Sequence, residues 1–302
     1  MERNEITSGA EIVTGAFKSA LVDFGLLVKF RLSLLVLFSA VMSYFIVAGA
    51  QFNWISVLLL SLGGFLVTGA ANTLNQVLER DFDKQMLRTA NRPLATGRMT
   101  VSTAVLLAGV MALLGISFLS VFNPLTGFLG TLSLISYAFI YTPMKRYSAL
   151  AVWVGAIPGA LPNIIGTVAF EHQISLYGLM LFAIQFLWQF PHFWAVAWLA
   201  DEDYKKAGFS LLPSTSGEKD SSVGLISSIF CVALVLLSGA AWYIGLTGGI
   251  AAVILMGLNA YWAYSCLQLY KYCDRATARR QMFISFFHLP VTLIVLLLDK
   301  LF

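Results

Sequence analysis

The fold is decided by the stretch WISVLLLSLGGFLVTGAANTLNQVLERDFDKQMLRTANRPLATGR, residues 54–98. Its first part, 54–78, contains no charged residue, and it is long enough to cross a bilayer core, which takes about 20 apolar residues. Acidic and basic residues crowd the part that follows. The stretch therefore predicts a transmembrane helix with a charged end at one membrane surface.

The rest of the chain repeats this apolar pattern. Of its 302 residues, 59% are hydrophobic and 11% charged, against about 25% charged in soluble domains. We expect an all-α integral membrane protein, a single domain over 1–302, whose helices enclose a central cavity open near the cytosolic face. The nine predicted transmembrane helices are 32–49, 54–78, 101–121, 124–141, 148–169, 174–199, 222–243, 247–270 and 281–298.

Basic residues fall almost entirely on one side of these helices. Of the 19 Lys and Arg residues, 18 precede the first helix or follow the second, fourth, sixth and eighth, and only Lys300 lies on the other side. Because cytoplasmic loops are rich in Lys and Arg, the N-terminus is predicted inside and the C-terminus outside. This topology also explains the pI near 8.9 without a nucleic-acid partner.

The N-terminal segment 1–30 is predicted to be cytosolic or interfacial. Residues 1–20 mix acidic and basic side chains, which fits neither a secretory signal nor a transit peptide. Apolar positions broken by charges over 15–31 predict an amphipathic helix along the membrane interface. A bacterial cytoplasmic, or inner, membrane fits this multi-pass chain best.

A stripe of oxygen-bearing side chains ends the second apolar helix. Asn75, Glu79 and Asp83 are spaced four apart, so they share one helix face. Two carboxylates and an amide suit Mg²⁺ whose coordination is completed by phosphate oxygens. Arg88 and Arg92 follow with the same spacing, and guanidinium groups bind phosphate in a bidentate manner. The alternative is a charged helix end held by ion pairs, although ionisable residues continuing an apolar span are functional candidates by default.

A second acidic cluster follows the sixth apolar helix. It contains Asp201, Glu202 and Asp203, with Lys205 and Lys206 behind them. The second and sixth helices are four apart, so two related four-helix units would each bring carboxylates to one cavity. The alternative is a solvated loop.

Acidic and basic clusters on one membrane face suggest a reaction class. Metal ions and basic side chains stabilise a diphosphate leaving group, which allows an allylic diphosphate to ionise to a carbocation. That cation needs an apolar cavity that excludes water, with aromatic faces that stabilise positive charge.

Three motifs resemble the UbiA-type intramembrane prenyltransferases. The pattern N-x-x-x-E-R-D-F-D-x-x-M-x-R-T-x-x-R-P, 75–93, is similar to the family's first motif, and its RTxxRP tail resembles the protoheme IX farnesyltransferase (heme O synthase) branch. Two other matches are YTPMKR, 141–146, with GAIPGALPNIIG, 155–166, and FLWQFPHFWAVAW, 186–198, with DEDYKKAGFSLLP, 201–213. The similarity covers the chain from about residue 25 to 299.

The resemblance implies the transfer of a farnesyl group from farnesyl diphosphate to a vinyl group of heme b, with water adding a hydroxyl, to give heme O. Heme b is then a substrate, and Mg²⁺ is the cofactor. Heme A synthase is a candidate partner whose binding stays open. The implied catalytic residues are Asn75, Glu79, Asp83 and Asp203. The same four residues and Asp201 are the implied Mg²⁺ ligands. The implied diphosphate-binding residues are Arg88, Arg92, Lys145, Arg146 and Lys206.

The sequence departs from the family pattern at both acidic motifs. Glu79 stands where the first motif usually has Asp, which keeps the charge on a longer side chain. The second motif is D-x-D-Y rather than D-x-x-x-D, so the choice between Asp201 and Asp203 as metal ligand stays open.

His192, in QFPHFW, is the candidate residue for the heme acceptor. A histidine inside an apolar helix could ligate heme iron, carry a proton or simply pack, and the sequence leaves these three open. Gly155, Gly159 and Asn163, also four apart, predict a face for close helix packing.

Two other functions remain as alternatives. One is a prenyltransferase of the same family with an aromatic, quinone-precursor acceptor. The other is a secondary transporter, which would need ionisable groups near the bilayer midplane. The predicted helices carry few such groups there.

Overall fold

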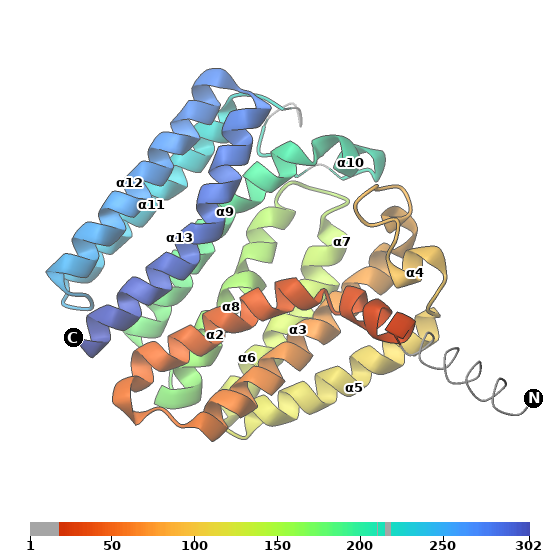
Figure 1. The fold of residues 1–302 in the computed structure, drawn as a ribbon, viewed down its shortest axis with the longest axis horizontal. Helices are drawn as coiled ribbons and strands as arrows, with labels where there is room; N and C mark the ends of the chain where they lie inside the picture. Colours follow the sequence, from red (N-terminus) through yellow and green to blue (C-terminus); the bar gives the residue numbers. More distant parts are fainter. Residues whose placement is uncertain (1–17, 210, 215–218) are drawn as a thin grey trace, which may run out of the picture.

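A computed structural model describes residues 18–209, 211–214 and 219–302, and these residues contain no β-strand. The chain forms a bundle of long helices (Figure 1). Residues 18–27 are helical, within the predicted interfacial helix 15–31; its first residues, 15–17, lie outside the described part. The elements that follow are α2 (Phe30–Ala48), η1 (Gly49–Gln51), α3 (Trp54–Asp83), α4 (Pro93–Thr96), α5 (Val101–Ser120), α6 (Pro124–Ile135), η2 (Ser136–Tyr141), α7 (Thr142–Met144), α8 (Ala151–Glu171), α9 (Leu176–Leu199), α10 (Asp201–Lys206), α11 (Ser222–Tyr243), α12 (Gly249–Tyr272) and α13 (Arg275–Leu301).

Within the described ranges, 9 helices are long and apolar enough to cross a membrane, as the sequence predicted. The largest differences are at charged ends: α3 continues to Asp83 instead of residue 78, and α13 begins at Arg275 instead of 281. A charged residue ends an apolar segment in the sequence, but the helix itself can continue through it. The exposed end of α3 is stabilised by ion pairs from Asp81 to Arg80 and Lys84, within one helical turn.

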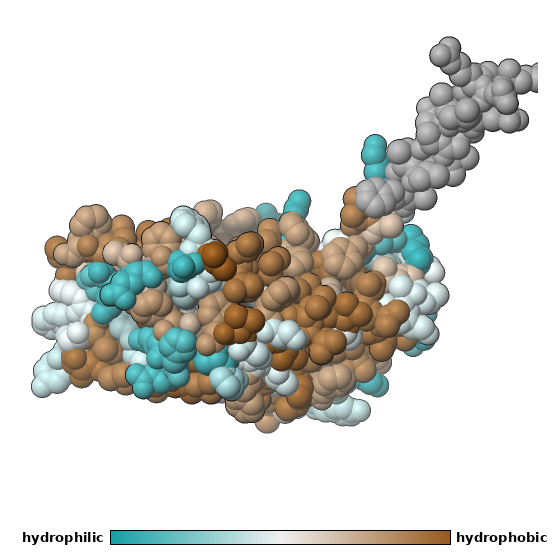
Figure 2. Space-filling view, turned by 90° about the horizontal axis from the view of Figure 1, so that it is seen from below, coloured by the Kyte–Doolittle hydropathy of each residue, from teal (hydrophilic) through white to brown (hydrophobic). Residues whose placement is uncertain are grey.

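Large apolar side chains cover the outside of the bundle. Leu106, Leu113 and Leu236 are 68%, 70% and 69% exposed, and Figure 2 shows a face covered mostly by hydrophobic residues. Such a surface would be unfavourable in water and suits contact with lipid chains.

The two ends of the bundle differ in character. The short helices α4 and α10 lie at one end, and the C-terminus lies at the other (Figure 1). The charged segments 84–98 and 201–206 thus gather at one end, as the alternation of basic connections predicted.

Helix α8 lies at the centre of the bundle and packs against α2, α6 and α9. It contains Pro158 and Pro162. Because Pro162 has no N–H, the carbonyl of Pro158 lacks its helical donor, and Ser133 Oγ donates to this carbonyl instead. Its glycines make room for neighbours, as predicted: a Cβ at Gly155 would lie 2.6 Å from the Tyr141 ring, and one at Gly159 2.0 Å from Gln189 Oε1.

Candidate active site

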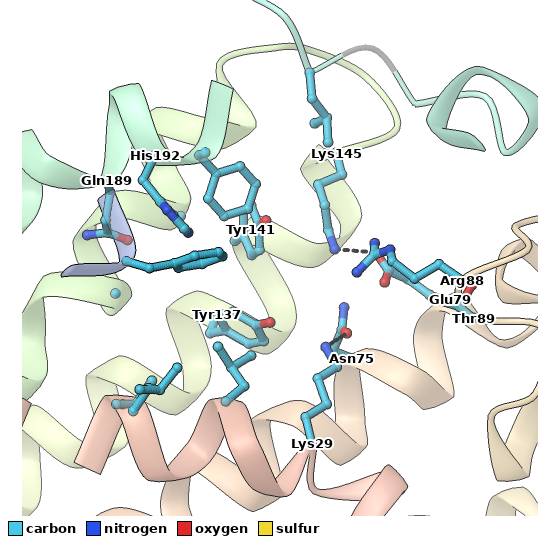
Figure 3. A pocket seen from close by; sticks show the side chains of 18 of the residues that line it. Lys29, Asn75, Glu79, Arg88, Thr89, Tyr137, Tyr141, Lys145, Gln189 and His192 are labelled. Carbon is cyan, nitrogen blue, oxygen red and sulfur yellow. Dashed lines mark hydrogen bonds and ion pairs between the residues drawn. The ribbon is translucent and has the colours of Figure 1, made fainter. Parts of the chain in front are cut away.

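A cavity of about 370 Å³ lies inside the bundle, at the end that carries the charged segments. One end of its lining is charged, and the other is aromatic and apolar with a few amides. Figure 3 shows Lys29 and Lys145 entering from opposite sides, with Gln189 and His192 across the cavity from Glu79. The charged end contains Lys29, Asn75, Glu79, Asp83, Arg88, Arg92 and Lys145; the other contains Gln185, Trp188, Gln189, His192, Phe193 and Phe286.

The predicted stripe on α3 forms the floor of the charged end. Asn75, Glu79 and Asp83 are all buried, with exposures of 1%, 5% and 1%, and all three line the cavity. Because α3 remains helical through Asp83, the four-residue spacing brings them onto one face, as predicted.

Each residue of the stripe contacts a basic side chain from another part of the chain. Two of these contacts are drawn in Figure 3. The matched groups are nearly removed from water, so their electrostatic interaction is stronger than it would be at a surface. The pairs are Lys29–Asn75 at 2.8 Å, Lys145–Glu79 at 2.5 Å and Arg92–Asp83 at 2.7 Å.

Lys29 reaches the stripe because the chain turns sharply before α2. It adopts a left-handed conformation, φ 49°, which is uncommon for a residue other than glycine. Side chains from α3 hold this turn by hydrogen-bonding the carbonyls that end the preceding helical residues. Gln76 Nε2 donates to Leu26 O and Leu27 O, and Asn72 Nδ2 donates to Val28 O.

The charge of Lys29 is destabilised where it stands. Burial, together with the nearby cations Arg92 and Lys145, holds the pKa of Lys29 well below its ordinary value. A negatively charged ligand in the cavity would favour the charged form again.

Lys145 is positioned by an irregular helix. Residues Ser136–Tyr141 form a π-helix, a rare element that often occurs at functional sites. It directs Tyr137 and Tyr141 to the cavity, and Lys145 Nζ lies 4.8 Å from the centroid of the Tyr141 ring. The hydroxyl of Thr142, the first residue of α7 directly after the π-helix, accepts from Asn75 Nδ2 at 3.1 Å and so ties α3 to α7.

Arg88 lines the cavity beside α10. Its Nη2 donates to the Tyr204 hydroxyl at 3.2 Å, and the guanidinium lies 5.6 Å from the centre of that ring. Tyr204 lines the cavity too, so α10 contributes an aromatic hydroxyl.

The other predicted ligands lie outside the cavity lining. Arg146 stacks over the Phe82 ring at 4.4 Å. Asp201, Asp203 and Lys206 are on α10, where neighbouring lysines hold the carboxylates: Asp201 is 3.1 Å from Lys205 and Asp203 is 4.0 Å from Lys206. The structure does not bring these four side chains together with the α3 stripe, so their roles stay predictions.

The stripe suits a magnesium–diphosphate complex. Among the described residues no group of three or more His, Cys, Asp and Glu side chains forms a metal cluster. Mg²⁺ bound with a phosphate substrate needs few protein ligands, since phosphate oxygens and water supply the others. The carboxylates of Glu79 and Asp83 and the amide oxygen of Asn75 fit that requirement.

Sequence comparison identifies the fold and the motifs together. The model of the UbiA prenyltransferase family matches residues 36–289, which include the α3 stripe and most of the residues that line the cavity. The chain belongs to the UbiA prenyltransferase family. The resemblance to this family that the sequence predicted is therefore confirmed.

Curated relatives within the family are similar over most of the chain. The protoheme IX farnesyltransferase of Cytophaga hutchinsonii is 40% identical over 277 residues, which are 91% of this chain and 96% of that protein. The mitochondrial protoheme IX farnesyltransferase of Homo sapiens is 37% identical over 273 residues, 90% of this chain and 61% of the human protein.

Solved structures of other proteins have the same fold. A structure from work on digeranylgeranylglyceryl phosphate synthase in membranes superimposes on this chain with a TM-score of 0.78 at 15% identity. The superposition covers 93% of this chain and 98% of that one. A UbiA homolog from Archaeoglobus fulgidus bound to GPP and Mg²⁺ gives 0.69 at 14% identity, covering 91% and 99%. At these identities the likeness concerns the fold.

At the far end of this UbiA-family cavity lies His192. Its Nδ1 is 2.7 Å from Ser285 Oγ, and its ring stacks on Trp188 with centroids 4.5 Å apart. His192 also lines the cavity, and its role stays a prediction.

Several cavity residues did not stand out in the sequence. The sequence indicates Lys29 only as one of the basic residues that set the topology. Two polar side chains inside the apolar helix α9, Gln185 and Gln189, line the cavity with His192. Their spacing of four and three residues indicates that they share one helix face with His192. Polar side chains within a membrane helix usually face the interior of the helix bundle, so this spacing could have predicted their position.

Proposed function

We propose that this chain transfers the farnesyl group of farnesyl diphosphate to a vinyl carbon of heme b and, with addition of water, produces heme O. The proposal rests on one observation above all: a single cavity joins a cation-rich, carboxylate-bearing end to an aromatic end that contains His192. It is supported by curated relatives named protoheme IX farnesyltransferase, 40% and 37% identical.

The charged end would hold the diphosphate. Mg²⁺ bound by Asn75, Glu79 and Asp83 would neutralise phosphate charge and so favour departure of the diphosphate. Lys29, Lys145 and Arg92 now face these oxygens. On substrate binding they would turn to the phosphate oxygens, to which charged donors bind strongly.

The allylic cation would form between the two ends. Breaking the bond between C1 and the bridging oxygen leaves both electrons on the diphosphate and a positive charge on the farnesyl chain. Tyr137, Tyr141 and Phe193 line this region, and aromatic faces stabilise a neighbouring cation. The vinyl group of heme b then bonds to C1, and water adds to the porphyrin side with loss of a proton.

The finer assignments are part of the same proposal. The charged end of the bundle would face the cytosol of a bacterial inner membrane, as the distribution of basic residues predicts. Asp201 and Asp203 would supply a second pair of Mg²⁺ ligands after leaving their lysine partners, and Arg146 and Lys206 would contact phosphate. Heme A synthase would receive the product.

Acceptor choice is the decisive test. The purified full-length chain in lipid nanodiscs is given Mg²⁺ and farnesyl diphosphate with either heme b or 4-hydroxybenzoate, and products are identified by mass. We expect a farnesylated, hydroxylated heme and release of diphosphate. A product from the phenol alone would overturn the proposal, and Mg²⁺-independent turnover would overturn the metal assignment.

A further inference from the structure

The acceptor end of the cavity contains a stripe of hydrogen-bond acceptors on α9. Gln185, Gln189 and His192 are separated by four and three residues, so they lie on one helix face, and all three line the cavity. Figure 3 shows Gln189 and His192 side by side at this end.

The two glutamines are held in a fixed orientation. Gln185 Nε2 donates to Gly159 O at 2.8 Å, and Gln189 Nε2 donates to Ala156 O at 2.9 Å. A carbonyl oxygen can only accept, so the amide nitrogens must face α8 and each Oε1 must face away from those carbonyls.

The Oε1 atom of Gln185 lacks a donor among the described residues. Gln185 is only 5% exposed, and its Oε1 receives no hydrogen bond within the described part of the chain. A buried acceptor of this kind is normally satisfied by water or a ligand. Gln189 packs its amide against Gly159, since a Cβ at that position would lie 2.0 Å from Gln189 Oε1.

His192 adds a basic nitrogen to the stripe. The single hydroxyl proton of Ser285 is donated to Met282 O, so Ser285 Oγ must accept from Nδ1–H of His192. The hydrogen bond at one ring nitrogen sets the tautomer, which leaves the lone pair of Nε2 available on the cavity side. Stacking on Trp188 fixes the plane of the ring.

We infer that Gln185, Gln189 and His192 form the site that holds the attacking water, with His192 Nε2 as the base that takes its proton. This inference rests on the proposed function. Bonding of the terminal vinyl carbon to farnesyl C1 leaves a cation on the inner vinyl carbon. The water oxygen bonds to that carbon, and one water proton passes to Nε2, so the hydroxyl of the product is formed and charge is balanced.

Without a held water, the same cation loses a proton from a neighbouring carbon. The product is then an alkene that is lighter by one water, while the diphosphate is released as before. The ratio of hydroxylated to anhydro product therefore reports on the water site separately from farnesyl transfer.

The experiment compares Gln185→Met, Gln189→Met and His192→Ala with the unaltered chain in nanodiscs, using Mg²⁺, farnesyl diphosphate, heme b and ¹⁸O-labelled water. Loss of one hydrogen bond lowers water capture by up to about tenfold, and loss of the base by about 100-fold. We expect the ¹⁸O-hydroxylated fraction to fall accordingly, with diphosphate still released. Asn259→Leu is the matched control, since Asn259 also donates an amide hydrogen bond to a backbone carbonyl but does not line the cavity, and its product should remain hydroxylated.

Two results would overturn the inference. One is a fully hydroxylated product from all three variants. The other is loss of a histidine-ligated heme absorption spectrum in His192→Ala, since a nitrogen bound to iron cannot accept a proton. Absence of heme-dependent diphosphate release from the unaltered chain would instead refute the proposed function itself.

Discussion

Arg92 Nη1 lies 2.8 Å from one oxygen of Asp83 and 2.7 Å from the other. The carboxylate is 1% exposed and the guanidinium 15% exposed. Removing one partner of a buried ion pair leaves an uncompensated charge, which is strongly destabilising. The contact therefore has a structural role in addition to the proposed diphosphate site, and variants must separate the two.

Asp83→Asn keeps the shape of the side chain and removes its charge. We expect turnover of the folded fraction to fall by about 100-fold or more, the scale on which loss of one charge-stabilising group acts. The unfolding temperature should fall as well, because Arg92 loses its charged partner, and it is measured to separate the two effects. Diphosphate release is measured against Mg²⁺ concentration. Asp81→Asn is the control, because Asp81 is on the same helix but 65% exposed; equal losses in both variants would contradict the assignment.

The position of this site followed from the sequence because one helix contains it. Asn75, Glu79 and Asp83 needed only helical periodicity to be brought together. Their partners could not be predicted in the same way. Lys145 reaches Glu79 through a π-helix, and no apolar or polar period in the sequence indicates that element.

Lys29 shows a second limit of the sequence. Nothing near it in the chain predicts that it enters the cavity, because its direction depends on Gln76 and Asn72 in the next helix. For α10 the reverse holds: its two aspartates are conspicuous in the sequence, yet they pair with Lys205 and Lys206 and lie outside the cavity lining. Periodicity shows which residues share one face of a helix. It does not show where a short helix such as α10 directs that face in the folded protein.

Lys29→Met should weaken binding of farnesyl diphosphate by about tenfold or more, because a hydrogen bond to a charged group contributes about 1.5–3 kcal/mol. Titration calorimetry in the absence of heme measures this directly. Lys84→Met is the matched control, since Lys84 is 51% exposed and pairs with Asp81. An unchanged affinity in Lys29→Met would exclude a role in diphosphate binding.

The same side chain predicts a pH dependence of binding. The pKa of Lys29 lies well below its ordinary value of 10.5 in the free protein because of burial and nearby cations, and a bound diphosphate raises it again. Binding then takes up a proton at pH values between the two pKa values, so affinity falls as pH rises through that window. Calorimetry in buffers of different ionisation enthalpy detects the uptake, and Lys29→Met should abolish it.

Gly155→Ala tests how closely α8 approaches the π-helix. The added methyl would lie 2.6 Å from the Tyr141 ring, so Tyr141 must move, and small misplacements in an active site can lower turnover by about 100-fold. We expect reduced kcat with an intact fold. Gly257→Ala is the control, because a Cβ there meets nothing within 4 Å; full activity in Gly155→Ala would show that Tyr141 need not be placed where it is.

Ser285→Ala tests the orientation of His192. The variant removes the acceptor for Nδ1–H, so the imidazole is free to change tautomer and to turn its lone pair away from the cavity. We expect a lower hydroxylated fraction of product, smaller in effect than that of His192→Ala, with diphosphate release nearly unchanged. Ser228→Ala is matched to it, since Ser228 is also buried and also donates to a carbonyl three residues earlier. A merely structural role of Ser285 would lower total turnover in both variants and leave the composition of the product as it was.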